Sequence, residues 1–164
     1  MPIISTDIQS RLSGGAANAA ALASIGGVKS SNAIPASLFD NTTGAESAAG
    51  DIEYRCFYVH NNHATLTLVA PVIFFTALAP GAGHAIALGV GASATNGIET
   101  AVANEDTAPV GVTFSSPTTQ ATGLALADIP AGQHRAVWLR RTVTAGSGAS
   151  NTTFTPRVIG ETGP

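Results

Sequence analysis

The sequence contains few charged residues, few aromatic side chains, one cysteine and no long hydrophobic run. Only 10% of the 164 residues are charged, whereas an average soluble domain has roughly 25%. The seven lysines and arginines are scattered without a basic run, which argues against a nucleic-acid partner because phosphate binding needs clustered cations. The single cysteine, Cys56, excludes an intramolecular disulfide and any metal site built from several cysteines.

Apolar stretches are too short for a membrane-spanning helix, which needs about 20 consecutive apolar residues. The longest candidate, residues 64–80, is interrupted by Thr65, Thr67, Pro71 and Thr76. The first residues lack the basic and apolar segments of a secretory signal. We therefore expect a soluble protein that is made in a cytoplasm and binds no membrane.

Small side chains and two Gly-Gly pairs dominate the first 37 residues, which carry no pattern that would bury one face. Residues 16–23 are rich in alanine, but the glycine pairs confine any helix there to about two turns, which is marginal in water. We therefore predict an extended N-terminal arm over residues 1–37 that becomes ordered on another subunit. The alternative is a floppy terminus.

From Asp51 onward the pattern is typical of β-structure. Residues 52–59 alternate between two faces, and Tyr54 and Tyr58 share a face that we expect to be buried. The polar break at Asn61-Asn62 predicts a tight hairpin to a second strand.

Further short strands are expected along the rest of the chain. They cover residues 72–78, a second hairpin-like pair at 84–91 and 97–103, two short strands within 108–129, His134 to Val143, and 153–161. Pro156 favours an edge position for the last of these. Roughly seven to nine short strands without intervening helices predict an all-β antiparallel sandwich over residues 38–164, with an Ig-like fold as first choice and a jelly roll as second.

One cysteine and two histidines lie close together in the segment RCFYVHNNH, residues 55–63. Cys56 and His60 share one face of the predicted strand, and His63 follows across the turn, so a two-histidine clip for a transition metal is geometrically possible. Structural zinc, however, needs four ligands and catalytic zinc three plus water. The nearest acidic residues lie at the far end of the strand, so we interpret this segment as a turn and predict no metal site.

No catalytic constellation is present either. The sequence has no Gly-x-Ser-x-Gly elbow and no glycine-rich phosphate loop before a helix. Glu99, Glu105 and Asp106 gather around one loop, where we expect them to be solvated rather than paired for glycoside cleavage. We therefore predict no enzyme, no catalytic residues and no cofactor.

Two short segments are candidates for contact with a partner. The first lies in the arm, where a single arginine stands among small residues that could lie flat along the edge of a partner's sheet: Arg11, Leu12, Ser13, Gly14 and Gly15. The second is the pair Arg140-Arg141, whose side chains point to opposite faces of one strand. One of these two arginines must face inward or toward a partner, and the alternative is an edge strand guarded by charge.

The sequence also resembles a group of small structural proteins of tailed bacteriophages. The pieces that carry the resemblance are RLSGG at residues 11–15, GDIEYRC at 50–56 and PAGQH at 130–134. The likeness spans nearly the whole chain, although residues 71–108 match only loosely.

The resemblance implies a virion component, assembled in the bacterial host cytoplasm, and above all a capsid decoration (cement) or minor capsid protein. Such a protein is β-rich, often trimeric, and binds the major capsid protein lattice and neighbouring copies of itself. Two alternatives stay open: a tail, neck or baseplate structural protein, and a carbohydrate-binding or adhesin module. The sequence has only one Trp and two Tyr for sugar stacking.

Overall fold

The computed structural model describes residues 1–148 and 152–163, and nearly all regular structure in that part of the chain is β. The strands are β1 (Ile8–Leu12), β2 (Asp51–Asn61), β3 (Leu68–Ala79), β4 (His84–Val90), β5 (Phe114–Ser115), β6 (Leu124–Ala125), β7 (His134–Val143) and β8 (Thr153–Thr162). Helix α1 (Gly44–Ala49) and three single 3-10 turns, η1 (Ser5–Asp7), η2 (Ala21–Ala23) and η3 (Gln120–Thr122), lie between them. No helix in residues 1–148 and 152–163 is long and apolar enough to cross a membrane.

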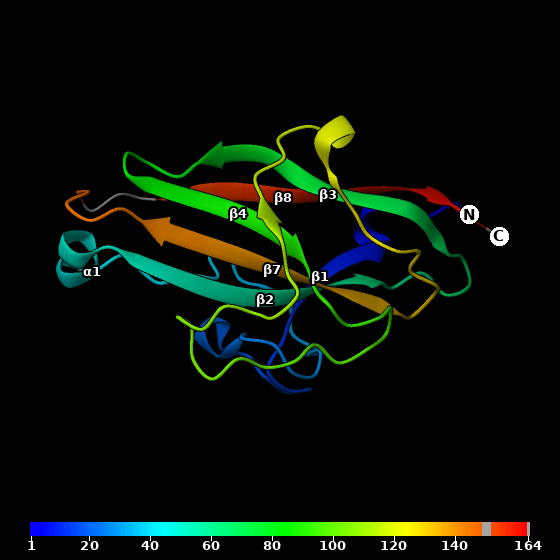
Figure 1. Cartoon of the computed structure of the whole chain (residues 1–164). Helices are drawn as coiled ribbons and strands as arrows, with labels where there is room; N and C mark the ends of the chain where they lie inside the picture. The colour runs from blue at the N-terminus through cyan, green and yellow to red at the C-terminus, as the bar shows by residue number, and fades with distance from the viewer. Residues whose placement is uncertain (149–151, 164) are drawn as a thin grey trace.

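Two antiparallel sheets pack face to face as a sandwich (Figure 1). The larger sheet has the strand order β1-β2-β7-β4-β5, and the smaller one has the order β6-β3-β8. The predicted all-β antiparallel sandwich is confirmed. The choice between an Ig-like fold and a jelly roll stays a prediction.

The main hydrophobic core lies between the two sheets. Alternate residues of β2 and β7 point into it, as Phe57 and Val137 do from directly paired positions. Each fully buried side chain of this size contributes about 1.5–3 kcal/mol through the hydrophobic effect. The buried members of the core are Leu12, Leu38, Phe39, Phe57, Val59, Leu68, Ile73, Phe75, Ile86, Leu88, Leu126, Ile129, Val137 and Leu139.

The opposite face of the larger sheet is buried as well. Tyr54, Cys56, Tyr58, Ala136 and Trp138 form a second cluster there, so the predicted burial of the face shared by the two tyrosines is confirmed. Figure 1 shows what covers it: two long loops on the side of the larger sheet away from β3 and β8. A sheet that is covered on both faces explains why nearly every residue of β2 is buried.

The first 37 residues do not form a separate arm. β1 adds to the edge of the larger sheet, pairing with β2 from Ile8 opposite Asn61 to Leu12 opposite Phe57. The Leu12 N–H also donates to Asn32 O, and the Ile34 N–H donates to Ser10 O. The expectation of an extended arm is corrected for this reason: the segment finds its hydrogen-bond partners and its apolar contacts within its own chain. Residues 16–23 contribute only the turn η2.

Both predicted hairpins are wrong. β2 and β3 belong to different sheets, and residues 62–67 carry the chain between them. The Asn61 side chain donates to Leu66 O and Ile129 O, and His63 Nδ1 accepts from the Thr65 and Leu66 N–H groups, which makes a wider connection than a two-residue turn.

The second predicted hairpin does not form because β4 pairs with β7 and β5 rather than with residues 97–103. Residues 97–103 form no strand, and Glu99 joins Gly27 in an isolated bridge. By contrast, β7 covers the predicted residues His134 to Val143, and β8 is an edge strand that contains Pro156, as expected.

Candidate functional site: the outer face of the larger sheet

Two loops form what we call the outer layer, residues 13–31 and 91–113, which covers the outer face of the larger sheet (Figure 1). The loops are joined to each other, because the Gly27 N–H donates to Glu99 O at 2.8 Å and the Val102 N–H donates to Ile25 O at 2.9 Å. The outer layer is therefore one connected surface built from segments about 80 residues apart in the sequence.

Glycines and buried serines allow residues 13–31 to lie flat on the sheet. Gly14 has a φ of +91°, and a Cβ there would lie 2.3 Å from Ala23 O. Gly26 has a φ of +97°, and a Cβ there would lie 2.5 Å from Thr100 O. The fully buried Ser13 hydroxyl donates to Cys56 O and accepts from the Gly26 N–H, so a loop with little apolar side-chain volume is held by hydrogen bonds.

Glu99 anchors the other loop and is 2% exposed. Its carboxylate accepts from Trp138 Nε1 at 3.0 Å and from the Ala92 and Ser93 N–H groups at 3.1 and 2.9 Å. Burial alone would raise the pKa of Glu99, but hydrogen bonds from Ser93, Trp138 and Ala92 outweigh it and lower the pKa below the ordinary 4.5. The expectation that Glu99 is a solvated surface residue is therefore wrong.

The candidate residues Arg11 to Gly15 are only partly accessible. Leu12 and Ser13 are buried within the chain at 1% and 0% exposure, so neither can touch a partner. The Arg11 side chain is half-buried, and its guanidinium donates to Ser31 O and Gln9 Oε1. Gly14 and Gly15 form the turn that follows β1, with Gly14 packed against backbone and Gly15 open to space.

Arg140 and Arg141 do point to opposite faces of β7, as predicted. The Arg140 guanidinium lies over the Phe114 ring on the outer face, 5.1 Å from its centroid. Arg141 is 3% exposed and faces inward, so it is not available to a partner. Its surroundings are acidic and aromatic, with Glu53, Asp40 and the Phe39 ring in contact.

Arg141 belongs to a group that we call the inner ion-pair network: Asp40, Glu53, Arg55, Glu105 and Arg141. Glu53 pairs with Arg141 directly and with Arg55 at 3.7 Å, while Asp40 and Glu105 each bind one of the two arginines. Burial raises the pKa of Glu53 to about 7, against the attraction of Arg141 and Arg55. The network lies at one end of the main core and contains three acidic side chains and two arginines.

A second group of basic side chains, the outer basic cluster, comprises Arg11, Lys29, His60 and His134. His60 and His134 are directly paired between β2 and β7. Arg11 pairs with Tyr58, whose ring packs edge-on against His134 with centroids 4.8 Å apart. The four side chains come from three strands and a loop, so no single sequence motif contains them.

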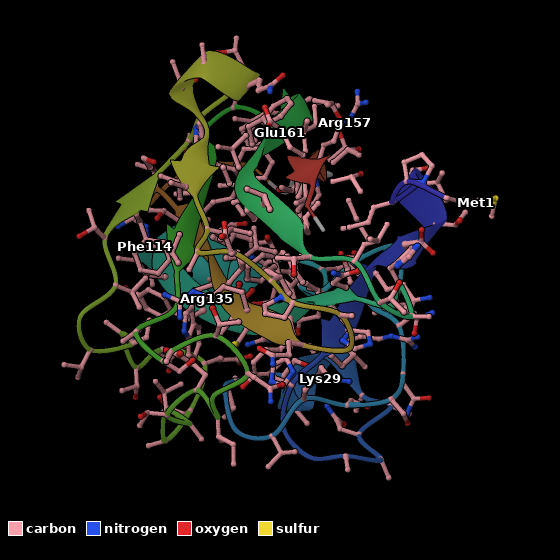
Figure 2. The ribbon with its side chains drawn as sticks, turned by 90° about the vertical axis from the view of Figure 1, so that its right-hand side faces the viewer. Met1, Lys29, Phe114, Arg135, Arg157 and Glu161 are labelled. Carbon is pink, nitrogen blue, oxygen red and sulfur yellow. The ribbon has the colours of Figure 1, made fainter. Side chains whose placement is uncertain are left out.

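Lys29 reaches this cluster because its loop is tied to the sheet. The Tyr58 hydroxyl donates to Gly27 O at 2.6 Å, and the Ser30 N–H donates to Leu12 O at 2.8 Å. Figure 2 places Lys29 on the side of the sandwich away from Arg157 and Glu161.

The members of the cluster influence one another electrostatically. Burial and then Lys29 lower the pKa of both His60 and His134, and burial and then Arg11 lower the pKa of Lys29. In residues 1–148 and 152–163 neither Arg11 nor Lys29 forms an ion pair. Sequence reasoning missed this cluster because its members are far apart in the chain.

The segment around Cys56 is not arranged as a metal site. Cys56 is fully buried against the outer layer, and burial raises the pKa of its thiol, which disfavours the thiolate that a metal needs. His60 Nδ1 lies 3.1 Å from Gln133 O, and His63 Nδ1 accepts backbone N–H groups. Within the described part of the chain no group of three or more His, Cys, Asp or Glu side chains could hold a metal ion.

A shallow cavity of about 500 Å³ lies on the other side of the molecule, where the bulge of β3 meets β8 and η3. Ala70, Val72, Ala121 and Ile159 form its apolar wall, and Glu161 is its one charged residue. One carboxylate without a neighbouring base or nucleophile makes no catalytic set. The predicted lack of enzymatic activity stays a prediction.

Comparison with known proteins identifies no relative: no family model, no curated protein and no solved structure matches this chain.

Proposed function

We propose that the protein is a structural component of a tailed-bacteriophage virion, a capsid decoration (cement) or minor capsid protein. In this proposal it binds the major capsid protein lattice and neighbouring copies of itself, as a homo-oligomer with a trimer favoured, and so stabilises the shell. The resemblance of its sequence blocks to phage structural proteins is the origin of the proposal, and the outer layer supports it.

The observation that carries the proposal is the chemistry of the outer layer. Four large apolar side chains are exposed on it: Leu22 at 50%, Val28 at 43%, Ile98 at 66% and Val110 at 92%. Lys29 is the only charged residue in the whole of residues 13–31. Exposed apolar side chains on a surface that has few charges are typical of protein–protein contact.

A surface of this kind can bind tightly when many copies of the protein attach to a repeating lattice. Each contact can be modest, because a symmetric particle presents many copies and a linked array binds far more tightly than a single site. In this proposal the first 37 residues still provide much of the contact, but as a folded layer on the sandwich rather than as a free arm. Replacing Arg11 with alanine is expected to weaken binding to the shell.

Deleting residues 1–37 would be a poor test, because the deletion removes β1 and uncovers Cys56 and Tyr58. The better experiment counts copies of the protein in purified virions against the major shell protein, by quantitative mass spectrometry. A ratio near one to one supports a decoration protein. A dozen copies or fewer would favour the neck, tail or baseplate, and absence from the virion would contradict the proposal.

A further inference from the structure

We infer that the outer basic cluster, Arg11, Lys29, His60 and His134, is a docking point for carboxylates on an acidic segment of a protein partner. The inference goes beyond the proposed function because it names the chemistry of the partner. It also does not depend on the particle in which the protein works, so the isolated chain can be tested.

The outer basic cluster has no internal counter-charge in the described residues. The chain has ten acidic residues and a net charge of −3, yet the acids that form ion pairs in its described part all lie in the inner network, with Arg55 and Arg141. Within residues 1–148 and 152–163, Arg11 donates only to neutral oxygens, on Ser31 and Gln9. Half-buried cations that repel one another are unfavourable unless an anion joins them.

The four side chains of the cluster are held in place by the larger sheet and by a loop bonded to it. His60 and His134 are directly paired on the neighbouring strands β2 and β7, which holds them side by side. Arg11 lies on β1, the edge strand next to β2. The loop that carries Lys29 is hydrogen-bonded to β1 and to Tyr58. Groups held on strands keep their geometry, so a ligand would meet a preorganised site.

The size and charge of the cluster favour carboxylates over nucleic acid. Nucleic acid is bound by a long stripe of cations that displaces many counterions, whereas this cluster is one compact patch on a chain of net negative charge. The lysine ammonium and the arginine fork are suited to one or two carboxylates. The apolar side chain of Val28, next to Lys29, is exposed beside the charges, which fits a peptide better than a bare phosphate chain.

The experiment is a titration of the full-length chain with a hexaglutamate peptide at low salt, followed by NMR through the imidazole signals of His60 and His134. Hexaglutamine serves as the neutral control peptide. We expect a saturable shift with hexaglutamate only, weakened at high salt because the contact is electrostatic. Lys29→Ala should weaken binding about fivefold, which corresponds to roughly 1 kcal/mol, and Lys29→Arg should preserve it.

Arg157→Ala is the matched control, since it removes an exposed cation on β8, on the other side of the molecule. It should bind as the wild type does. The inference is overturned if hexaglutamate causes no shift, if hexaglutamine causes the same shift, or if Lys29→Ala and Arg157→Ala bind alike. Tighter binding of hexathymidylate, or a response to inorganic phosphate without one to the peptide, would also overturn it.

Discussion

The two groups of ionisable side chains, on opposite faces of the larger sheet, have opposite arrangements. In the inner ion-pair network Arg141 and Arg55 are buried against Glu53, with Asp40 and Glu105 at the rim. In the outer basic cluster Arg11 and Lys29 are half-buried and have no acidic partner in the described residues. The protein thus pairs the arginines of the inner network with acidic residues and leaves the cations of the outer basic cluster without a counter-charge at the surface.

The difference indicates separate roles. Breaking a buried ion pair leaves an unpaired charge inside the protein, so the inner network should matter for stability. A cluster of like charges at a surface adds nothing to stability by itself, so it should matter for binding.

Arg141→Leu should lower the free energy of unfolding by about 3–5 kcal/mol, because Glu53 would remain buried with only Arg55 beside it. The measurement is equilibrium unfolding in urea. The control is Arg140→Leu, in the adjacent residue on the other face, which loses only its contact with the Phe114 ring and should cost about 1 kcal/mol or less. Equal losses in the two variants would show that the inner network has no special role.

The cost of Arg141→Leu should also depend on pH. The pKa of Glu53 is about 7 in the folded protein, whereas its ordinary value is 4.5. The folded state therefore binds this proton more tightly than the unfolded state does. For this reason the contribution of Glu53 to stability falls as pH rises from 4.5 through 7. Without Arg141 the pKa should rise further. The destabilisation measured at pH 8 should therefore exceed that at pH 5.5, and a pH-independent difference would contradict this reasoning.

Gly14→Ala should destabilise the protein by about 1–3 kcal/mol, since alanine is strained at a positive φ and its Cβ would meet the Ala23 carbonyl. The turn at Gly14 lets the loop that carries Lys29 return over the sheet, so the outer basic cluster should be disturbed without any change of charge. Gly44→Ala, in the first turn of α1 where nothing crowds a Cβ, should be neutral or slightly stabilising. Thermal unfolding of both variants provides the comparison.

Lys29→Ala should raise the pKa of both His60 and His134 toward 6.5, because their lowered values arise from burial and then from Lys29. Both histidines favour the neutral form in the folded state, so their contribution to stability is present above pH 6.5 and is lost as pH falls through the lowered values. An NMR titration of the imidazole signals measures the shift directly. Unchanged pKa values would place Lys29 outside the cluster.

The existence of the strands could be predicted from local pattern, but their partners could not. In β7 the alternation of HRAVWLRRTV, preceded by a Pro-Ala-Gly turn, set both ends of the strand correctly. The same kind of alternation on both sides of Asn61-Asn62 led to a hairpin that does not form, because alternation identifies a strand and not the sheet it joins. The sheet that a strand joins depends on contacts such as the hydrogen bond of the Asn61 side chain to Ile129 O, 68 residues away.

Local signals were also overlooked. Thr43 and Glu46 form a reciprocal capping box at the start of α1, and the motif TGAE could have predicted that helix. The small side chains of residues 1–37 show no apolar face, which is why their pattern predicts an arm. Their burial depends on backbone hydrogen bonds and buried serines instead, which hydrophobic periodicity does not detect.

The candidate site was predictable only in part. Arg11 was identified, and the opposite orientations of Arg140 and Arg141 followed from strand geometry. The register of three strands and the path of a loop are needed to show that Arg11 lies in one cluster with Lys29, His60 and His134. The burial of Glu99 likewise depends on the fold of its loop over Trp138.

The most direct test of the division between the two groups is the free energy of unfolding of Lys29→Ala, measured in urea beside Arg141→Leu at pH 7. Lys29→Ala is predicted to stay within about 1 kcal/mol of the wild type or to exceed it, because it relieves repulsion and breaks no ion pair. A loss for Lys29→Ala as large as that for Arg141→Leu would mean that the outer basic cluster serves the fold, and would contradict the account.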